Sequence, residues 1–351
     1  MSGGVDSSVA AGLLVEQGYD VVGVTLNLTP QRITVAPGKP TCCGVSEIAD
    51  ARRVCERLGI PHYVLDMRDA FEQLVIAPFV EEYAAGRTPN PCIRCNKLIK
   101  FTMLREKARE MGAEIIATGH YARIEQSGGA CHLLRGVDRD KDQTYFLYAL
   151  SQEQLASTLF PLGAMTKDEV RAKAAEMGLP VAEKAESQDI CFAPEGGYVE
   201  AMAQYAAAQS PPGDIVHVDG RLLGRHEGIS RYTIGQRRGL GVAWTEPLYV
   251  IGLDPVRNHV IVGPDTELCR QDFRIKETNF APDIARGTVT EVTCRVRRNM
   301  IDVPATLEII GDGAARGRFH SPVRAITPGQ AAVFYDGKRV IGGGTITEVL
   351  G

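Results

Sequence analysis

The chain has 351 residues, enough for two or three domains with well-buried cores. Hydrophobic residues make up 44% of it and charged residues 23%, a composition typical of a folded globular protein. The formal net charge of −4 excludes binding to nucleic acid through overall charge, so any such binding needs local basic patches. No apolar run reaches the roughly 18 residues of a membrane span and no signal peptide opens the chain. We therefore expect a soluble cytoplasmic protein with no membrane partner.

The first eight residues, MSGGVDSS, stand directly before a helical pattern that starts at Val9. Glycines let backbone N–H groups approach phosphate oxygens, and serine hydroxyls at a helix N-terminus favour an anion. A plain glycine turn with a serine cap would explain the same residues. The Walker loop is absent, because no G-K-[ST] follows a glycine-rich loop. The pattern favours a phosphate-binding loop of another class.

The first half of the chain alternates helical and strand patterns. The apolar spacing predicts helices over 9–18, 46–60 and 97–111, strands over 21–28, 62–66 and 114–120, and helical structure between 150 and 186. This alternation indicates a parallel sheet covered by helices. A phosphate loop of this kind should follow a buried strand, yet only Met1 precedes it. We therefore expect an upstream apolar segment of roughly ten residues that supplies the first strand.

From about residue 211 the pattern changes to short alternating strands separated by Gly, Pro and Asp. Short strands at regular spacing are typical of small barrels or sandwiches. We predict three domains: an ATP-binding and catalytic domain over 1–205, a small central β-rich domain over 206–268, and a β-barrel over 269–351.

Nine cysteines are present, an odd number in a long chain, which excludes a secreted disulfide scaffold. We expect Cys55, Cys131, Cys269 and Cys294 to be structural. The pair in TPNPCIRCNKLIKF (88–101) could be a metal knuckle, a redox pair, or one working thiol beside a bystander. Cys191, in SQDICFA, could by itself be a core residue.

Taken together, these segments resemble the tRNA-uridine 2-sulfurtransferase family from Ser2 to near Gly351. The opening S-G-G-x-D-S-S resembles the loop of ATP pyrophosphatases, which use ATP to adenylate a carbonyl oxygen. The other matching motifs are AGRTPNP (85–91), NPxxxCNKxIKF (90–101), ATGHY (117–121), LLRGxDxxKDQTYFL (133–147), GQRxGLG (235–241) and TPGQxAVFY (327–335). The resemblance implies an α/β fold: a parallel-sheet ATP-pyrophosphatase-type (PP-loop) domain, then two small β-rich domains, the last a β-barrel.

The resemblance also implies a reaction, the ATP-dependent 2-thiolation of the wobble uridine of tRNA. ATP with Mg²⁺ adenylates the uracil 2-oxygen, and a persulfide on Cys191 delivers sulfur to the activated carbon. Cys95 either frees sulfide from that persulfide or attacks it after transfer, leaving a transient Cys95–Cys191 disulfide. Both routes need a thiolate at Cys95, and the nearby Arg94 and Lys97 would stabilise it.

Binding residues are implied position by position. Asn90, Pro91 and Cys92 are expected at the target base, which must leave its stack for chemistry. The tRNA contacts are expected from His120, Lys141, Asp142, Gln143, Arg297, Arg298 and Gln330. ATP contacts are expected from Met1, Ser2, Gly3, Gly4, Val5, Asp6, Ser7, Ser8, Leu26 and Gly119. Five arginines in 221–238 form a further basic patch suited to an RNA backbone, although a solvated face would explain them equally.

Cys92 departs from the family pattern, which often has aspartate at this position. One interpretation is a neutral substitution. The other is that Cys92, Cys95 and Cys191 hold an iron–sulfur cluster with one iron open to sulfide. A closed zinc site is disfavoured, because no second C-x-x-C or nearby His supplies the missing ligands.

Expected partners are the tRNA anticodon loop and, as sulfur donor, a sulfur-relay protein or a cysteine desulfurase. Two other functions fit parts of the pattern: a different PP-loop adenylating ligase, which needs no paired thiols, and a non-catalytic tRNA-binding protein with a relic ATP site.

Overall fold

The computed structural model describes residues 1–30, 45–185, 191–192 and 210–350. The chain divides into two compact units. The first comprises Met1–Val75, Cys92–Ala201 and Lys338–Val340, and the second comprises Ile76–Pro91, Met202–Gly337 and Ile341–Gly351. Within the described ranges, no helix has both the length and the apolar character needed to cross a membrane.

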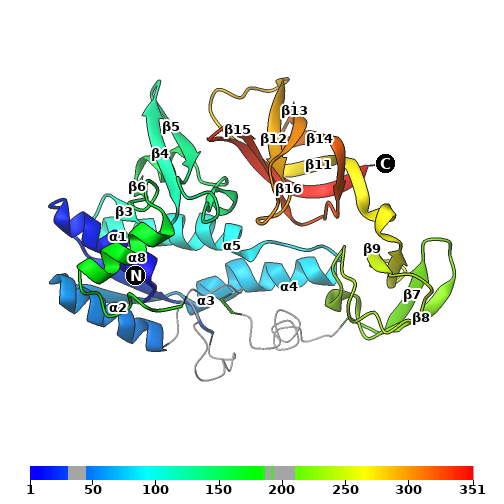
Figure 1. Cartoon of the computed structure of the whole chain (residues 1–351), viewed down its shortest axis with the longest axis horizontal. Coiled ribbons are helices and arrows are strands. Elements are labelled where there is room, and N and C mark those ends of the chain that lie inside the picture. The colour runs from blue at the N-terminus through cyan, green and yellow to red at the C-terminus, as the bar shows by residue number, and fades with distance from the viewer. Residues whose placement is uncertain (31–44, 186–190, 193–209, 351) are drawn as a thin grey trace. The chain divides into compact units, whose positions relative to one another are not determined.

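The elements before residue 180 are mostly short (Figure 1). The α-helices are α1 (Val5–Glu16), α2 (Val45–Leu58), α3 (Arg68–Phe71), α4 (Ala77–Ala84), α5 (Pro91–Arg94), α6 (Leu104–Glu110), α7 (Gln152–Ala156) and α8 (Lys167–Glu176). The strands are β1 (Gly23–Asn27), β2 (His62–Asp66), β3 (Ile116–Ala117), β4 (Ala122–Ser127), β5 (Ala130–Arg135) and β6 (Thr158–Leu159). Two π-helices, Glu72–Ile76 and Cys95–Met103, and a 3₁₀ turn, Thr144–Phe146, complete this part.

Parallel pairing is present, as the alternating pattern predicted. β1 pairs with β2 from Gly23↔His62 to Asn27↔Asp66, and β3 pairs with β6. Among the described residues these pairs form two separate two-stranded sheets. The predicted strand over 114–120 is reduced to two residues, and the hairpin of β4 and β5 was not predicted from the sequence.

The core of the first unit lies between α1 and α8, which Figure 1 shows side by side. Val5, Val9 and Ala10 of α1 join the same buried cluster as Val170 and Ala174 of α8. A capping box starts α8, since the Thr166 hydroxyl accepts from the Glu169 backbone and the Glu169 carboxylate accepts from that of Thr166. Packing and capping together hold the start of α8 against the start of α1.

The second unit contains a small sheet and a barrel. The sheet has the order β8-β7-β10-β9, with β7 (Gly213–His217), β8 (Leu222–His226), β9 (Tyr249–Asp254) and β10 (His259–Gly263). Its core gathers Ile215, Val250, Val260 and Val262. Short 3₁₀ turns cover Ile229–Arg231 and Asp265–Leu268.

The barrel consists of β11 (Cys269–Phe280), β12 (Val289–Arg295), β13 (Val303–Gly311), β14 (Ala314–Arg324), β15 (Ala331–Asp336) and β16 (Arg339–Leu350), coloured yellow to red in Figure 1. They follow the order β11-β14-β13-β12-β15-β16, and β11 also pairs with β16, which closes the ring. Phe273, Phe319 and Phe334 fill its centre and are fully buried. The predicted fold class, an α/β domain followed by β-rich parts ending in a barrel, is confirmed. The three domain boundaries stay a prediction.

Candidate active site

The phosphate loop (residues 1–8) folds back on the first turn of α1. The Ser2 amide donates to Ser7 Oγ at 3.1 Å, and the Ser7 and Ser8 hydroxyls donate to the Gly4 carbonyl at 3.1 and 2.8 Å. Gly4 is the N-cap of α1, and no side chain caps the helix there. The first-turn N–H groups of α1 are therefore not used by a capping side chain, which suits an anionic ligand.

Two donors hold the Asp6 carboxylate in this loop. The Tyr121 hydroxyl donates to Asp6 Oδ1 at 2.9 Å, and Lys167 Nζ donates to the same oxygen at 2.7 Å. Tyr121 is 2% exposed and Lys167 7% exposed, so both contacts are largely shielded from water. The geometry of Asp6 is thus fixed by residues far away in the sequence.

Gly119 closes the other side of the loop. A Cβ at this position would lie 2.7 Å from the backbone of Asp6 and Ser7, so no other residue fits without moving the loop. Gly3 has φ +69°, and a Cβ there would lie 2.3 Å from the Glu47 carbonyl oxygen. Of the three predicted ATP-site glycines, Gly3 and Gly119 are therefore required by close backbone approach, whereas a Cβ at Gly4 would meet only an ordinary contact of 3.5 Å with Ser2 Oγ. Lys184 adds an anchor, since its Nζ donates to the Gly3 carbonyl at 3.1 Å.

Leu26 is buried on β1. The amino group of Met1 donates to the Val24 carbonyl on the same strand. The structure thus places the start of the phosphate loop beside β1. It describes no contact that would test whether Leu26 meets adenine.

Cys95 begins the π-helix Cys95–Met103 and is 8% exposed. Side chains from outside this helix bind its backbone and its polar groups. Gln154 Nε2 donates to the Lys97 and Phe101 carbonyls at 3.1 Å each, and Asn96 Nδ2 donates to the Phe146 carbonyl at 3.2 Å. π-Helices are rare and are frequent at functional sites.

Contacts beside Cys95 and Cys191 meet on one short segment. The Phe192 ring packs edge-on against Phe71, with centroids 5.8 Å apart. Three residues further along, the Leu74 carbonyl accepts a hydrogen bond of 3.1 Å from Arg94 Nε. Phe192, which follows Cys191, and Arg94, which precedes Cys95, therefore contact Phe71 and Leu74, two positions about one helical turn apart. The pairing of Cys95 with Cys191 stays a prediction.

The predicted iron–sulfur cluster does not fit the arrangement of its three cysteines. Cys92, Cys95 and Cys191 all lie in the described ranges, and Cys92 is exposed on α5 while Cys95 is buried. Across those ranges, no three His, Cys, Asp or Glu side chains are gathered as a metal ion would require.

The KDQ loop (residues 138–144) carries three of the predicted tRNA contacts. Lys141 and Gln143 are half-buried, whereas the Asp142 side chain is 1% exposed. Its carboxylate accepts from Arg135 Nη1 at 3.1 Å, from the Gly136 amide at 3.3 Å and from the Thr144 hydroxyl at 2.9 Å. An RNA contact through the Asp142 side chain would require these bonds to break.

His120 packs against two aromatic rings, with the centroids of Phe101 and Phe160 each 6.0 Å from its own and 6.1 Å from each other. Its Nδ1 lies 2.8 Å from the Thr118 hydroxyl. Burial, and then the nearby Lys100 charge, lower the pKa of His120 well below its usual value. The ring is therefore neutral at physiological pH and can contact RNA only as a neutral group.

In the second unit, the turn that contains Asn90 and Pro91 lies beside the turn that contains Gln330. The Thr88 amide donates to the Pro328 carbonyl at 2.9 Å, two residues before each of these positions. The structure thus brings together a segment predicted to meet the target base and a segment predicted to bind tRNA.

The basic residues of the second unit are partly engaged. Arg297 and Arg298 are exposed, and Arg297 Nη2 donates to the Arg324 carbonyl at 2.9 Å. In the 221–238 patch, Asp219 lies 2.5 Å from Arg221 and Glu227 lies 3.1 Å from Arg231. Acidic neighbours therefore reduce the positive charge that the sequence suggested for this patch.

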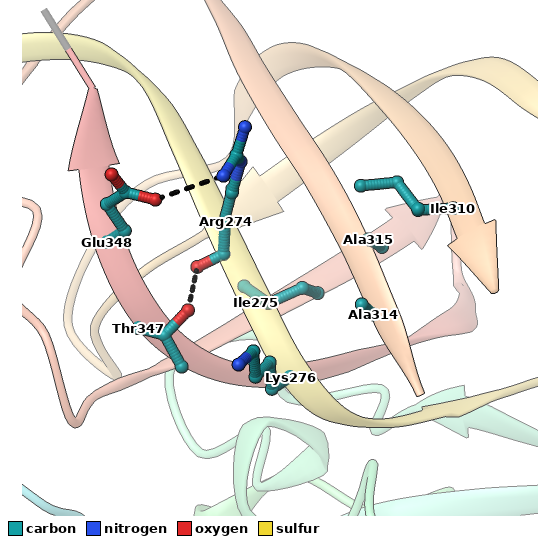
Figure 2. Close-up of a pocket in the computed structure, with 8 residues that line it drawn as sticks. All are labelled: Arg274, Ile275, Lys276, Ile310, Ala314, Ala315, Thr347 and Glu348. Atoms are coloured by element: carbon teal, nitrogen blue, oxygen red, sulfur yellow. Dashed lines mark hydrogen bonds and ion pairs between the residues drawn. The ribbon is translucent and has the colours of Figure 1, made fainter. Parts of the chain in front are cut away.

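A surface pocket of about 350 Å³ lies on the barrel where β11 divides its pairing between β14 and β16 (Figure 2). Arg274 Nη1 meets Glu348 Oε2 at 3.3 Å at its rim, and Ile275 and Ala315 line it. None of its lining residues belongs to the predicted site. We interpret the pocket as a consequence of barrel closure.

Comparison with known proteins covers the whole chain. The profile of the "tRNA methyl transferase HUP domain" matches residues 1–195, that of the "tRNA methyl transferase PRC-barrel domain" 200–264, and that of the "Aminomethyltransferase beta-barrel domain" 270–346. The "tRNA-specific 2-thiouridylase MnmA" of Geobacter metallireducens is 51% identical over 100% of this chain and 96% of its own length. The chain belongs to the tRNA-specific 2-thiouridylase MnmA family.

Other MnmA relatives agree. The protein of Geotalea uraniireducens is 50% identical over 100% of this chain and 94% of its own length. The protein of Moorella thermoacetica is 51% identical over 99% of this chain and 98% of its own length. Among solved structures, an NMN synthetase from Francisella tularensis is 19% identical, with a TM-score of 0.32 over 53% of this chain and 63% of its own, too weak a likeness for any argument. Membership of the MnmA family confirms the family predicted from the sequence motifs.

Sequence reasoning assigned no role to three residues that hold the phosphate loop, namely Tyr121, Lys167 and Lys184. Tyr121 stands in the ATGHY motif, and the T-K-D-E signature of a helix start includes Lys167. These signals mark the segments, but they do not reveal that the side chains reach residues 3 and 6.

Proposed function

We propose that this chain is an ATP-dependent tRNA 2-thiouridylase that acts on the wobble uridine. The observation that carries the proposal is full-length identity of 51% to a 2-thiouridylase, together with both predicted reactive cysteines in this chain. The fixed phosphate loop and the contacts that bring the two thiol segments to one helix support the same reaction.

The phosphate loop would bind ATP through the N-terminus of α1 and the Ser2 and Ser7 hydroxyls, while the fully buried Ser8 would hold the Gly4 carbonyl in place. Mg²⁺ is usually held by one or two carboxylates and the substrate phosphates, and it neutralises phosphate charge. Asp6 is the carboxylate that this loop offers. A single carboxylate fits a metal bound mainly through the nucleotide.

The target uridine would be adenylated at its 2-oxygen, with release of pyrophosphate. The terminal sulfur of a Cys191 persulfide would then attack C2, and AMP would leave with the oxygen. A thiolate at Cys95 would attack the Cys191 sulfur, forming the Cys95–Cys191 disulfide and leaving the 2-thiocarbonyl on the base. Alternatively, Cys95 would attack the persulfide first and free sulfide as the nucleophile. An external reductant restores both thiols in either route.

The full chain should be incubated with ATP, Mg²⁺, a cysteine desulfurase system and tRNA. Mass spectrometry of the wobble nucleosides should show a gain of sulfur in place of oxygen that depends on ATP. If ATP and tRNA bind but no thiolated nucleoside forms with any sulfur donor, the proposed reaction is refuted in favour of RNA binding without catalysis.

A further inference from the structure

The KDQ loop holds both of the donors that fix Asp6. On one side, Gln143 brackets the backbone of Tyr121, because Gln143 Oε1 accepts from the Tyr121 amide at 2.9 Å and the Gln143 amide donates to the Tyr121 carbonyl at 3.0 Å. The Tyr121 hydroxyl then donates to Asp6 Oδ1 at 2.9 Å. This is the tyrosine arm: Gln143, Tyr121, Asp6.

A second connection runs from the other end of the same loop. Asp138 Oδ2 accepts from the Lys167 amide at 2.9 Å, and Lys167 Nζ donates to Asp6 Oδ1 at 2.7 Å. Asp138 Oδ1 also accepts from the Asp140 and Lys141 amides at 3.1 and 3.2 Å, which fixes its own position in the loop. This is the lysine arm: Asp138, Lys167, Asp6.

The base of the loop is rigid. The buried Asp142 carboxylate binds Arg135, Gly136 and Thr144, and the Arg135 side chain is fully buried. A buried ion pair resists displacement, because separating its members leaves a buried charge without its partner. Because Asp142 is held in place, a displacement of the outer residues of the loop should move Gln143 and Asp138 more than it moves Asp142.

We propose that Asp138, Gln143, Tyr121 and Lys167 are positioning residues that couple RNA binding at the KDQ loop to the nucleotide-binding state of Asp6. Asp142 holds the loop in place while these four residues move or stay. The inference rests on the proposed function, because it takes the KDQ loop as an RNA contact and the phosphate loop as the ATP site. Thermodynamic linkage then requires that nucleotide raise RNA affinity by the same factor as RNA raises nucleotide affinity.

The test measures that factor directly. The dissociation constant of the full chain for a tRNA transcript with a wobble uridine is determined with and without saturating α,β-methylene-ATP and Mg²⁺. Coupling factors of about 5 to 150 are typical of linked sites. We expect the wild-type ratio in this range, and we expect Tyr121→Phe, which removes only the hydroxyl on Asp6, to bring it several-fold closer to one. Without nucleotide, the affinity of Tyr121→Phe for RNA should equal that of the wild type. A substitution that only destabilised the fold would also weaken RNA binding without nucleotide.

Double variants separate the two arms. Gln143→Met and Tyr121→Phe lie in the same arm, so their combination should reduce the ratio no further than one of them alone. Asp138→Ala lies in the other arm, so its effect should multiply with that of Tyr121→Phe. Tyr63→Phe is the matched control, since Tyr63 is a half-exposed tyrosine on β2, and its ratio should equal the wild-type value.

The outcomes distinguish this inference from the proposed function. If the wild type binds both ligands with a ratio of one, or if Tyr121→Phe keeps the wild-type ratio, the coupling is refuted while the thiolation reaction stands. If the wild type binds no tRNA or no nucleotide, the proposed function fails and the coupling fails with it.

Discussion

The first unit and the C-terminal barrel hold their residues in place by different means. The barrel strands run to 12 residues and form a closed ring of backbone ladders around three buried phenylalanines. The first unit has strands of two to six residues, and side chains such as Asp142, Gln154 and Lys167 connect segments that no ladder joins. Backbone hydrogen bonds between strands do not depend on side-chain identity, so most substitutions leave them intact. A hydrogen bond made by a side chain is lost when that one residue is replaced. Single substitutions should therefore have larger effects on function and stability in the first unit than comparable substitutions in the second unit.

The largest difference should appear among the cysteines. Cys191→Ser and Cys95→Ser should each lower thiolation by at least about a thousandfold, because a serine hydroxyl can neither carry sulfane sulfur nor resolve a persulfide. Pyrophosphate release with tRNA should persist in Cys191→Ser, since adenylation precedes sulfur attack and AMP leaves only when sulfur attacks. Pyrophosphate release and the nucleoside assay measure the two steps separately.

The matched control for these variants is Cys269→Ser at the start of β11 in the barrel. It should keep thiolation near the wild-type rate. Loss of pyrophosphate release in folded Cys191→Ser would show that the order of steps is wrong, and loss of thiolation in Cys269→Ser would contradict a reaction confined to Cys95 and Cys191.

Ion pairs provide the next contrast. Asp142→Asn should lower the free energy of unfolding by about 3 kcal/mol, because it leaves the buried Arg135 guanidinium without its counter-charge. Glu348→Gln in the barrel should cost about 1 kcal/mol or less, since the Arg274–Glu348 pair is more than half exposed. Chemical denaturation of both variants measures the difference. Equal costs would show that burial does not set the value of these pairs.

For glycine substitutions, the difference in stability cost between the two units should be smaller. Gly119→Ala places a methyl group 2.7 Å from the phosphate-loop backbone and should cost about 1–3 kcal/mol, with ATP binding weakened at least about tenfold. Gly252→Ala in β9 meets only an ordinary contact of 3.7 Å with Ile261 and should change stability by about 0.5 kcal/mol or less. Calorimetric titration with ATP checks the first effect. Unaltered ATP affinity in Gly119→Ala would refute close packing at the loop.

The smallest expected effect concerns pH. The pKa of His120 is lowered in the folded state, so below the ordinary value of 6.5 the unfolded state binds a proton that the folded state does not. Stability should therefore be full above pH 7 and fall towards pH 5, with His120 contributing at most about 1.4 kcal/mol per pH unit. His120→Gln should reduce this slope relative to the wild type, and the remaining slope should come from His62 and His226, whose pKa values burial also lowers. An identical slope in His120→Gln would contradict a neutral buried ring.

Some of this structure follows from local sequence. The strand over 62–66 has the predicted bounds, and the helix predicted over 46–60 is observed over Val45–Leu58, because a regular apolar spacing and a terminal Gly-x-Pro mark them. The helix predicted over 97–111 is instead a π-helix followed by α6, since i→i−5 hydrogen bonding has no distinct residue pattern.

The residues of the candidate site also fall into two groups, those that the sequence identifies and those that it does not. The glycines, serines and cysteines stand in short motifs, so a single sequence identifies them. Their supports do not, because Lys167 lies 161 residues from Asp6 and Tyr121 lies 115 residues from it. The burial of Asp142 was likewise hidden, since it depends on where β5 places Arg135. Motifs predict which groups react, and tertiary contacts decide which groups hold them.

The π-helix that begins at Cys95 also bears on how this segment can change in evolution. One residue inserted into an α-helix can be accommodated by a switch to i→i−5 hydrogen bonds, with little displacement of the flanking turns. Deletion of one residue between Cys95 and Met103 with return to regular α-geometry would therefore leave the turns at both ends of the segment close to their present orientation. Sequences that lack one residue here would keep the direction of the thiol relative to α6 by winding the same segment as an α-helix.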